Sequence, residues 1–347
     1  TKESGYNELE TLPNIDINIK VGNSLIHRFD LHQDISEILN KSDISINDYK
    51  NAVTQYKNAH SKDEKHALEE TINRIKSDFQ SYIFQHDPRL KRKYQIEREL
   101  DKVSSPLLFE VSKKEQAQRD KQAKELQKKL AKIQQEIDDI RNNRMFVGAF
   151  EWRIEFPEVL DEEGNFQGFD CIIGNPPYIQ LQKMGTDADA LQKMNYDTYE
   201  RTGDIYCLFY EMGMKLLRPG ALLSFITSNG WMKSAYGQSL RSLFAEKYAP
   251  SLLVDFAGYK VFESATVDVN ILNLKNDKGI VPTKACSIDK SGFDITKLSD
   301  YVQTHSQYSY FKVSEAWAIL SDIEQSIKQK VEIVGTPLKD WDVEIYR

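Results

Sequence analysis

The apolar positions of this chain follow two different periods, and each period occupies its own part of the sequence. Between residues 31 and 145 they recur at steps of three and four, the period of amphipathic helices. The first series ends at His86-Asp87-Pro88 and consists of Tyr49, Val53, Tyr56, Leu68, Ile72, Ile75, Phe79 and Tyr82. The second is a heptad seam with steps of 4, 3, 4 and 3, formed by Leu126, Leu130, Ile133, Ile137 and Ile140. Two helical segments separated by a break predict an antiparallel helical hairpin that packs on itself.

Residues 146–280 instead alternate short apolar runs with amphipathic segments, which is the pattern of an α/β domain. The pattern predicts strands at 169–174, 221–227, 251–257 and 267–275, and helices at about 204–217 and 237–247. Pro219-Gly220 should end the first of these helices and turn the chain into the next strand. A further strand is expected from Ile15 to Val21, and it should end at Gly22-Asn23.

The strand predicted at 169–174 leads directly into Asn175-Pro176-Pro177-Tyr178. Its run Cys171-Ile172-Ile173 is typical of a strand buried on both faces. The two prolines fix φ and remove two backbone donors, so the chain should leave the sheet as a stiff loop. Ligands of open α/β sheets bind at this edge, where the carboxyl ends of the strands lie. The plain alternative is a proline-rich turn without a function.

The chemistry of this loop suits an amino group. The Asn175 amide oxygen and the Pro176 carbonyl are two neighbouring acceptors, which could take both hydrogens of one exocyclic amine. Accepting both would direct the nitrogen lone pair towards a methyl donor. Tyr178 offers a flat face on which an extruded base could stack.

Composition adds two constraints. The net charge of -7, from 46 Lys and Arg against 53 Asp and Glu, is unusual for a protein that grips phosphates by itself. Lysines cluster locally between Lys113 and Lys132, where a solvated helix face is the commoner explanation than a DNA contact. Three cysteines without metal or disulfide spacing fit a reducing cytoplasm, and no apolar run is long enough to cross a membrane.

Asn175-Pro176-Pro177-Tyr178 resembles the catalytic motif of amino-methyltransferases that use S-adenosylmethionine, among which N6-adenine DNA methyltransferases are the largest group. Cytosine-N4 enzymes usually carry Ser in place of this Asn. Fused type IIG restriction–modification enzymes are the most similar kind. Further likeness to their methyltransferase part, all in the family's order, lies in residues 17–26, 151–159, 203–211, 216–229 and 335–341.

The resemblance implies roles for single residues. Asn175 and Pro176 would hold the amino group of the target adenine, while Tyr178 and Phe262 would stack on the flipped base. The cofactor-binding residues would be Asn23, Ser24, Pro177 and Phe209; no metal is implied. Phe262 and Phe209 could equally be ordinary core residues. Ser24 departs from the family pattern, because a large residue commonly stands there.

The resemblance also implies a fold and its division. The expected fold class is α/β: a Rossmann-like methyltransferase sheet lacking its first strands, with a long α-helical hairpin insertion. The chain would consist of a cofactor-side segment at 1–30, a helical insertion at 31–145, a catalytic domain at 146–280 and a connector to a target-recognition domain at 281–347. The family's Gly-rich turn for the cofactor has no counterpart, since no Gly-x-Gly occurs. The chain is therefore expected to be an internal fragment, inactive alone, whose polypeptide also contains an N-terminal cofactor-binding part and a C-terminal recognition domain.

The function expected from these observations is site-specific methylation of adenine N6 in double-stranded DNA, within a cytoplasmic bacterial restriction–modification enzyme that uses S-adenosylmethionine and does not contact membranes. Two alternatives remain open. One keeps the chemistry with RNA adenine or protein glutamine as the substrate. The other is a catalytically incomplete interaction or scaffold module, which the missing Gly-rich turn favours.

Overall fold

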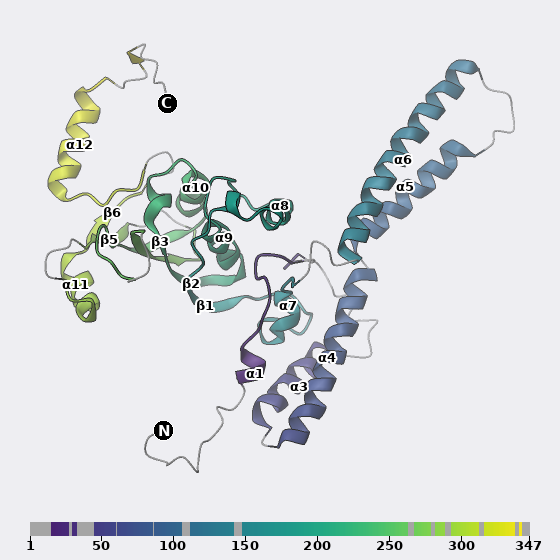
Figure 1. Ribbon diagram of the computed structural model, residues 1–347, viewed down its shortest axis with the longest axis horizontal. Helices are drawn as coiled ribbons and strands as arrows, with labels where there is room; N and C mark the ends of the chain where they lie inside the picture. Colours follow the sequence, from purple (N-terminus) through teal and green to yellow (C-terminus); the bar gives the residue numbers. More distant parts are fainter. Residues whose placement is uncertain are drawn as a thin grey trace. The chain divides into compact units, whose positions relative to one another are not determined.

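The computed structural model describes residues 15–27, 30–32, 45–59, 61–85, 87–105, 112–141, 148–262, 267–278, 282–288, 293–311, 316–336 and 340–341. The chain divides into two compact units, Thr1–Gln167 and Gly168–Arg347. The first unit is helical and the second contains the sheet (Figure 1). No helix among the described residues is long and apolar enough to cross a membrane.

The helices of the first unit pack mainly in pairs, α3 with α4 and α5 with α6. Its elements are α1 (Ile15–Asn18), α3 (Ile46–Asn58), α4 (Lys62–Gln85), α5 (Pro88–Ser104), α6 (Lys113–Arg141), α7 (Trp152–Glu155) and the 3-10 turn η1 (Pro157–Val159). Helical hairpins are thus present, but the predicted pairing of the first series with the seam at 126–140 is wrong: α6 pairs with α5, and α3 pairs with α4. Asp87 caps α5 and Pro88 occupies its first turn, so the break both ends one helix and starts another.

The strand expected from Ile15 to Val21 is wrong. Residues 15–18 form the short helix α1, and the next residues have no regular structure. Ile19 and Val21 are 65% and 96% exposed, so their side chains pack on no sheet. A single parallel bridge from Asn23 to Ala149 is the β-type pairing found here among the described residues. One bridge cannot hold an extended strand, because a ladder needs repeated partners.

The second unit is built on a six-stranded mixed sheet in the order β1-β2-β4-β3-β5-β6. Its strands are β1 (Phe169–Gly174), β2 (Leu217–Ser228), β3 (Ala249–Asp255), β4 (Val269–Lys275), β5 (Thr283–Ser287) and β6 (Gln307–Ser309). Its helices are α8 (Thr186–Lys193), α9 (Tyr206–Leu216), α10 (Gln238–Lys247), α11 (Leu298–His305) and α12 (Asp322–Val334), with 3-10 turns η2 (Leu181–Lys183), η3 (Asn229–Met232) and η4 (Ile295–Lys297). The α/β class and the strands predicted between 169 and 275 are confirmed.

Two details of the sheet differ from expectation. Among the described strands, β1 lies at the edge of the sheet and pairs with β2, and its apolar run is not buried on both faces: Ile173 is 82% exposed and Cys171 is exposed. Pro219-Gly220 lies inside β2 rather than before it. The register jumps there, from Phe169 opposite Leu217 to Cys171 opposite Leu222. Gly220 adopts φ +80°, which lets the strand bulge without breaking.

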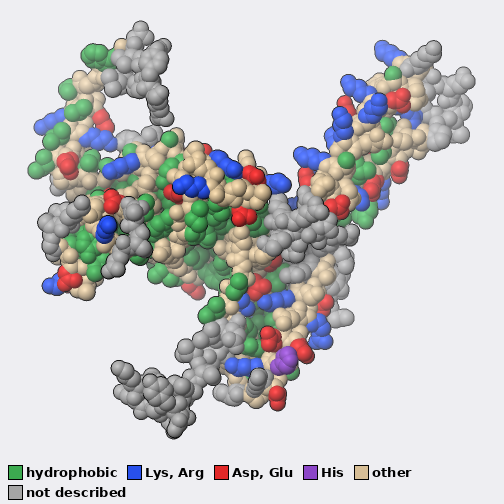
Figure 2. Space-filling view, viewed as in Figure 1, with side chains coloured by type: hydrophobic (Ala, Val, Ile, Leu, Met, Phe, Trp, Pro, Cys, Tyr) green, Lys and Arg blue, Asp and Glu red, His purple; other side chains and the backbone are tan. Residues whose placement is uncertain are grey.

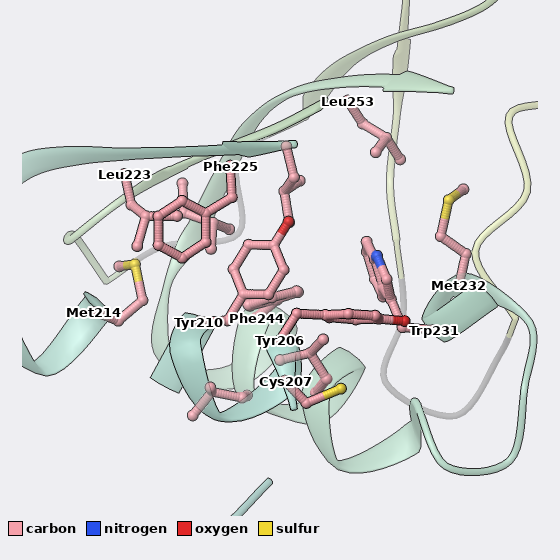
Figure 3. Packing of buried hydrophobic residues seen from close by; sticks show 14 of the residues in the cluster. Tyr206, Cys207, Tyr210, Met214, Leu223, Phe225, Trp231, Met232, Phe244 and Leu253 are labelled. Carbon is pink, nitrogen blue, oxygen red and sulfur yellow. The ribbon is translucent and has the colours of Figure 1, made fainter. Parts of the chain in front are cut away.

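Large aromatic side chains fill the core between the sheet and helices α9 and α10 (Figure 3). Tyr210 and Phe244 are fully buried with ring centroids 5.1 Å apart, and Trp231 lies 5.4 Å from Phe244. Helix α9 approaches β2 closely at Gly213, where an added Cβ would lie 2.5 Å from Leu223 Cδ1. This close packing holds β2 against α9 and so fixes the position of the carboxyl end of β2.

Candidate active site

Three segments that follow parallel strands meet at one edge of the sheet. Strands β1 and β2 are parallel, and β2 and β3 both run antiparallel to β4 between them. Their carboxyl ends therefore lie on the same side. Asn175 follows β1, Asn229 follows β2 and Asp255 ends β3. This edge is where an open α/β sheet binds its ligand.

The Asn-Pro-Pro-Tyr loop holds its own side chains in place. The Tyr178 hydroxyl shares its hydrogen between the Asn175 amide oxygen, at 2.9 Å, and the Ile226 carbonyl of β2, at 3.1 Å. Burial raises the pKa of Tyr178 to about 12, so the hydroxyl remains a donor at neutral pH. Asn175 itself is exposed. Its amide oxygen keeps a second lone pair for a ligand.

The neighbours of Asn175 are packed rather than loose. Pro176 is buried and Pro177 is exposed. On the other side, an added Cβ on Gly174 would lie 3.0 Å from the ring of Phe225 in β2. The absence of a side chain at 174 thus lets the loop start directly against the sheet.

The ring of Tyr178 is half-buried and lies edge-to-face on Tyr206, with centroids 6.1 Å apart and planes at 88°. The Tyr206 hydroxyl is 2.9 Å from that of Tyr236, which in turn donates to Asp204 at 3.2 Å. This phenol chain links the loop to the segments before α9 and α10. Sequence reasoning missed it, because its members are spread over thirty residues without a recognisable spacing.

Backbone pairing closes the other end of the loop. Ile205 N–H donates to the Ile179 carbonyl and Leu181 N–H donates to the Gly203 carbonyl, both at 2.9 Å. The loop is therefore tied to the start of α9 as well as to β2. Such double attachment preorganises the acceptors of Asn175 and Pro176.

A buried carboxylate supports the longer connection between the loop and α9. Glu211 is 1% exposed and accepts hydrogen bonds at 2.9 Å from both the backbone N–H and the hydroxyl of Thr198. Lys215, one turn further along α9, donates to it at 2.6 Å. The carboxylate is thus paired, as a buried charge must be.

Asn229 and Asp255 form a second polar pair at the same edge. The Asn229 amide donates to the Asp255 carboxylate at 2.8 Å, and Asp255 is only 7% exposed. Burial raises the pKa of Asp255, and the nearby Asp268 adds to this, while Asn229 and Lys233 oppose it. Only their positions at the ends of two predicted strands could have pointed to these residues.

The predicted site residues fall into both units. Asn175, Pro176, Pro177 and Tyr178 lie together, and Phe209 is half-buried on α9 against the main core. Phe262 is half-buried and packs against a smaller cluster around Phe256, which Tyr178 also contacts. Asn23 and Ser24 belong to the first unit. Asn23 is exposed, and its amide oxygen accepts from Leu25 N–H at 3.2 Å. The described residues hold no cluster of three His, Cys, Asp or Glu that could bind a metal.

This chain is similar to known restriction–modification methyltransferases. The Eco57I restriction-modification methylase family matches residues 17–262. Type II methyltransferase M.PaeR7I of Pseudomonas aeruginosa is 32% identical over 126 residues, which are 35% of this chain and 22% of that protein. Type II restriction enzyme and methyltransferase RM.Eco57I of Escherichia coli is 30% identical over 117 residues, 33% of this chain and 12% of that protein. This chain therefore spans only a minor part of the length of these relatives.

Among solved structures, the type IIG restriction endonuclease BpuSI matches 52% of this chain and 24% of its own, with 12% identity and a TM-score of 0.31. The family match includes the Asn-Pro-Pro-Tyr loop and strands β1, β2 and β3. Because the family match runs from residue 17 to residue 262, over more than half of its length, the chain belongs to the Eco57I restriction-modification methylase family.

Proposed function

We propose that this chain carries the catalytic loop of a DNA adenine-N6 methyltransferase that acts within a bacterial, cytoplasmic restriction–modification enzyme. The observation that carries the proposal is the exposed Asn175 carboxamide, held by Tyr178 at the ligand-binding edge of the sheet. Family membership supports the reaction class. The substrate is inferred from the Asn that opens the motif and from the relatives named as type II methyltransferases.

The residues of the loop would act by positioning. The free lone pair of Asn175 and the Pro176 carbonyl would each accept one hydrogen of the adenine amino group. This draws the nitrogen lone pair out of the ring and towards the incoming carbon. As the new C–N bond forms, the amino nitrogen gives up one proton to solvent. The gain is geometric, since both acceptors are fixed before the substrate arrives.

The target base would have to leave the duplex, at a cost of a few kcal/mol. The accessible part of Tyr178 and, next to the smaller cluster, Phe262 would then stack on it. Tyr178 cannot move freely, because its ring packs on Tyr206 and its hydroxyl is bonded. A fixed ring costs less ordering on binding than a mobile one.

S-adenosylmethionine would supply the methyl group from its sulfonium, whose C–S bond would break as the C–N bond forms and leave a neutral thioether. Asn23, Ser24, Pro177 and Phe209 are the residues proposed to hold it. The donor set fits in part: the exposed Asn23 amide oxygen has a second lone pair beyond its bond to Leu25, and could accept from the adenine amino group of the cofactor. Phe209 and Pro177 offer apolar surface.

The decisive test replaces Asn175 by Ala in the complete natural polypeptide. Methyl transfer to duplex DNA should fall by at least about 10²-fold, the effect of removing one preorganised hydrogen-bonding group. Cofactor binding should stay intact, because Asn175 is not among its proposed ligands. Gln182→Ala is the matched control, since this exposed amide contacts Gln180 and not the motif. Turnover of Asn175→Ala near that of the control would overturn the proposal, as would labelled methyl groups found in RNA or protein instead of DNA.

A further inference from the structure

The α5–α6 hairpin uses a narrow apolar seam and leaves the rest of both helices to solvent. The buried side chains of the seam are Ile96 on α5 and Leu126, Ile133 and Ile137 on α6. At 100° per residue, the three residues on α6 span about 40° of its circumference. The opposite side of α6 is therefore its outward face, and the same reasoning applies to α5.

The outward face of α6 is lined with lysines. Five lysines of α6, here called the lysine stripe, fall within about 80° of the helix circumference at 100° per residue. They lie roughly opposite the seam. The members of the stripe are Lys114, Lys121, Lys124, Lys128 and Lys132. Asp120 and Glu125 flank the stripe. It runs for about 27 Å along the helix, at 1.5 Å per residue. Figure 2 shows Lys and Arg side chains gathered along this side of the hairpin.

These lysines are exposed and make no ion pair with any described residue. Two of the nearby acids accept from amides: Gln116 donates to Asp120 at 3.0 Å and Gln134 donates to Asp138 at 2.9 Å. An ordinary solvated helix face spaces opposite charges to form pairs four residues apart. On α6, acids do stand four residues from three stripe lysines, Asp120 from Lys124, Glu125 from Lys121 and Glu136 from Lys132, but none of these described pairs forms an ion pair.

Helix α5 repeats the arrangement on its own outward face. Lys91, Arg98 and Lys102 are exposed and lie roughly opposite Ile96. Helices α5 and α6 together contain fifteen Lys and Arg against nine Asp and Glu, whereas the whole chain contains 46 against 53. The positive charge of an acidic protein is thus concentrated on one hairpin.

We propose that the α5–α6 hairpin is a contact surface for double-stranded DNA and that it binds phosphates through the lysine stripe. This surface is separate from the candidate active site. DNA as the ligand rests on the proposed function. The chemistry is charge complementarity with the phosphate backbone, which carries no sequence information. The stripe is straight, and its length is comparable to most of one helical turn of a duplex. A straight row of cations of this length suits the regular phosphate backbone of double-stranded DNA.

The hairpin also holds its shape independently of a ligand. Arg119 donates to the carbonyls of Val103 and Ser105 at the end of α5, at 2.6 and 2.8 Å, and so fastens α5 to α6 where the helices connect. The lysines are therefore presented on a preformed surface. Little ordering of the backbone would be needed on binding.

The test compares two variants of this chain with five Lys→Gln substitutions each. The first changes the whole lysine stripe. The control changes five exposed lysines of the second unit, Lys247, Lys275, Lys278, Lys297 and Lys330. Both variants have the same net charge. The stripe variant should retain its helix content by circular dichroism, because Lys and Gln have similar helix propensities.

Affinity for a labelled duplex of arbitrary sequence is measured by anisotropy between about 0.05 and 0.3 M salt, conditions of the order used to resolve counterion release. The stripe variant should bind at least about tenfold more weakly at the lowest salt. Its slope of log K against log salt should fall by up to about 4.5, since each phosphate that a lysine neutralises contributes about 0.9 to the slope. The control should stay within about threefold of the unchanged chain. Equal weakening in both variants would overturn the proposal, and so would stripe-dependent binding that prefers RNA.

Failure here is distinguishable from failure of the proposed function. If the complete enzyme methylates DNA and the stripe variant binds as the control does, this surface is wrong and the function stands. If stripe-dependent duplex binding is found without methyl transfer, the surface stands and the function is wrong.

Discussion

Helices α5 and α9 show how differently the two units are built. Of the 17 residues of α5, Ile96 alone is buried, whereas α9 buries nine of its eleven residues. Helix α5 packs on one other helix through a thin seam, while α9 lies against the sheet and an aromatic core. The difference follows from layering: a helix on a sheet can bury most of its surface, but a helix in a two-helix hairpin buries only one stripe.

This contrast indicates what each unit is suited to. The sheet unit can hold side chains in fixed positions, and the hairpin can expose many charged side chains. An acceptor that must be fixed in space needs the dense packing of the sheet unit, where the Tyr178 hydroxyl donates both to the Asn175 amide oxygen and to a β2 carbonyl. Contacts with phosphate need exposed cations, which the hairpin can carry because it buries so little. Each unit should therefore respond differently to the loss of one side chain.

The largest effect is expected from Phe244→Ala in the sheet unit. Phe244 is fully buried between Tyr210, Trp231 and Trp317, with centroids 5.1, 5.4 and 6.0 Å away. Its removal should lower the free energy of unfolding of this unit by about 3–5 kcal/mol. Urea unfolding followed by far-ultraviolet circular dichroism measures the change. A decrease below about 1 kcal/mol would show that this core is not the main source of stability.

A smaller and more local effect is expected from Ile133→Ala in the hairpin. Ile133 is 5% exposed, and truncating it should cost about 2–4 kcal/mol, since a two-helix seam can collapse partly around the cavity. Hydrogen exchange should accelerate in α5 and α6 while amides of β2 and β4 remain protected. Ala131→Gly, at an exposed position of the same helix, is the control, with an expected cost of about 1 kcal/mol. Equal acceleration in the sheet would contradict the separation of the two units.

The smallest effect, with a defined sign, concerns Asp255→Asn. Burial raises the pKa of Asp255 in the folded state, so the folded protein binds more protons than the unfolded chain between the two pKa values. The free energy of unfolding therefore falls as pH rises through that window. The substituted side-chain amide can still accept from Asn229 and carries no buried charge. The variant should melt higher than the unchanged protein at neutral pH, and the gap should close as the pH falls below the unfolded-state pKa of Asp, about 3.9. A lower melting temperature at every pH would mean that the carboxylate is needed for the pair with Asn229.

Local patterns predicted much of this structure from sequence alone. The strands from 169 to 275 and the helices at about 204–217 and 237–247 were readable because each carries its own period and turn residues. The heptad seam likewise predicted a helical hairpin. Its partner was mistaken, because a break at Asp87-Pro88 can end a helix or begin one. Periodicity does not encode which of two neighbouring helices fills a seam.

The errors at residues 15–21 and at Cys171 to Ile173 share one cause. Apolar residues in a row indicate a strand, but burial depends on neighbours that are remote in sequence. The Asn-Pro-Pro-Tyr loop was found because its prolines act locally. The tyrosine chain through Tyr206 and Tyr236 and the pair of Asn229 with Asp255 depend on the register of distant strands, which no local signal contains.

The close association of Trp231 and Trp317 gives the sheet unit an optical signature of its own. Both indoles are fully buried, with centroids 5.2 Å apart, and the Trp231 indole N–H donates to the Asn270 side chain. Rings this near should couple their electronic transitions and produce a paired band in the near-ultraviolet dichroism spectrum. The emission of both should shift to the red when water enters. The spectrum can thus report the packing of the core against which Tyr178 of the Asn-Pro-Pro-Tyr loop lies, without any added label.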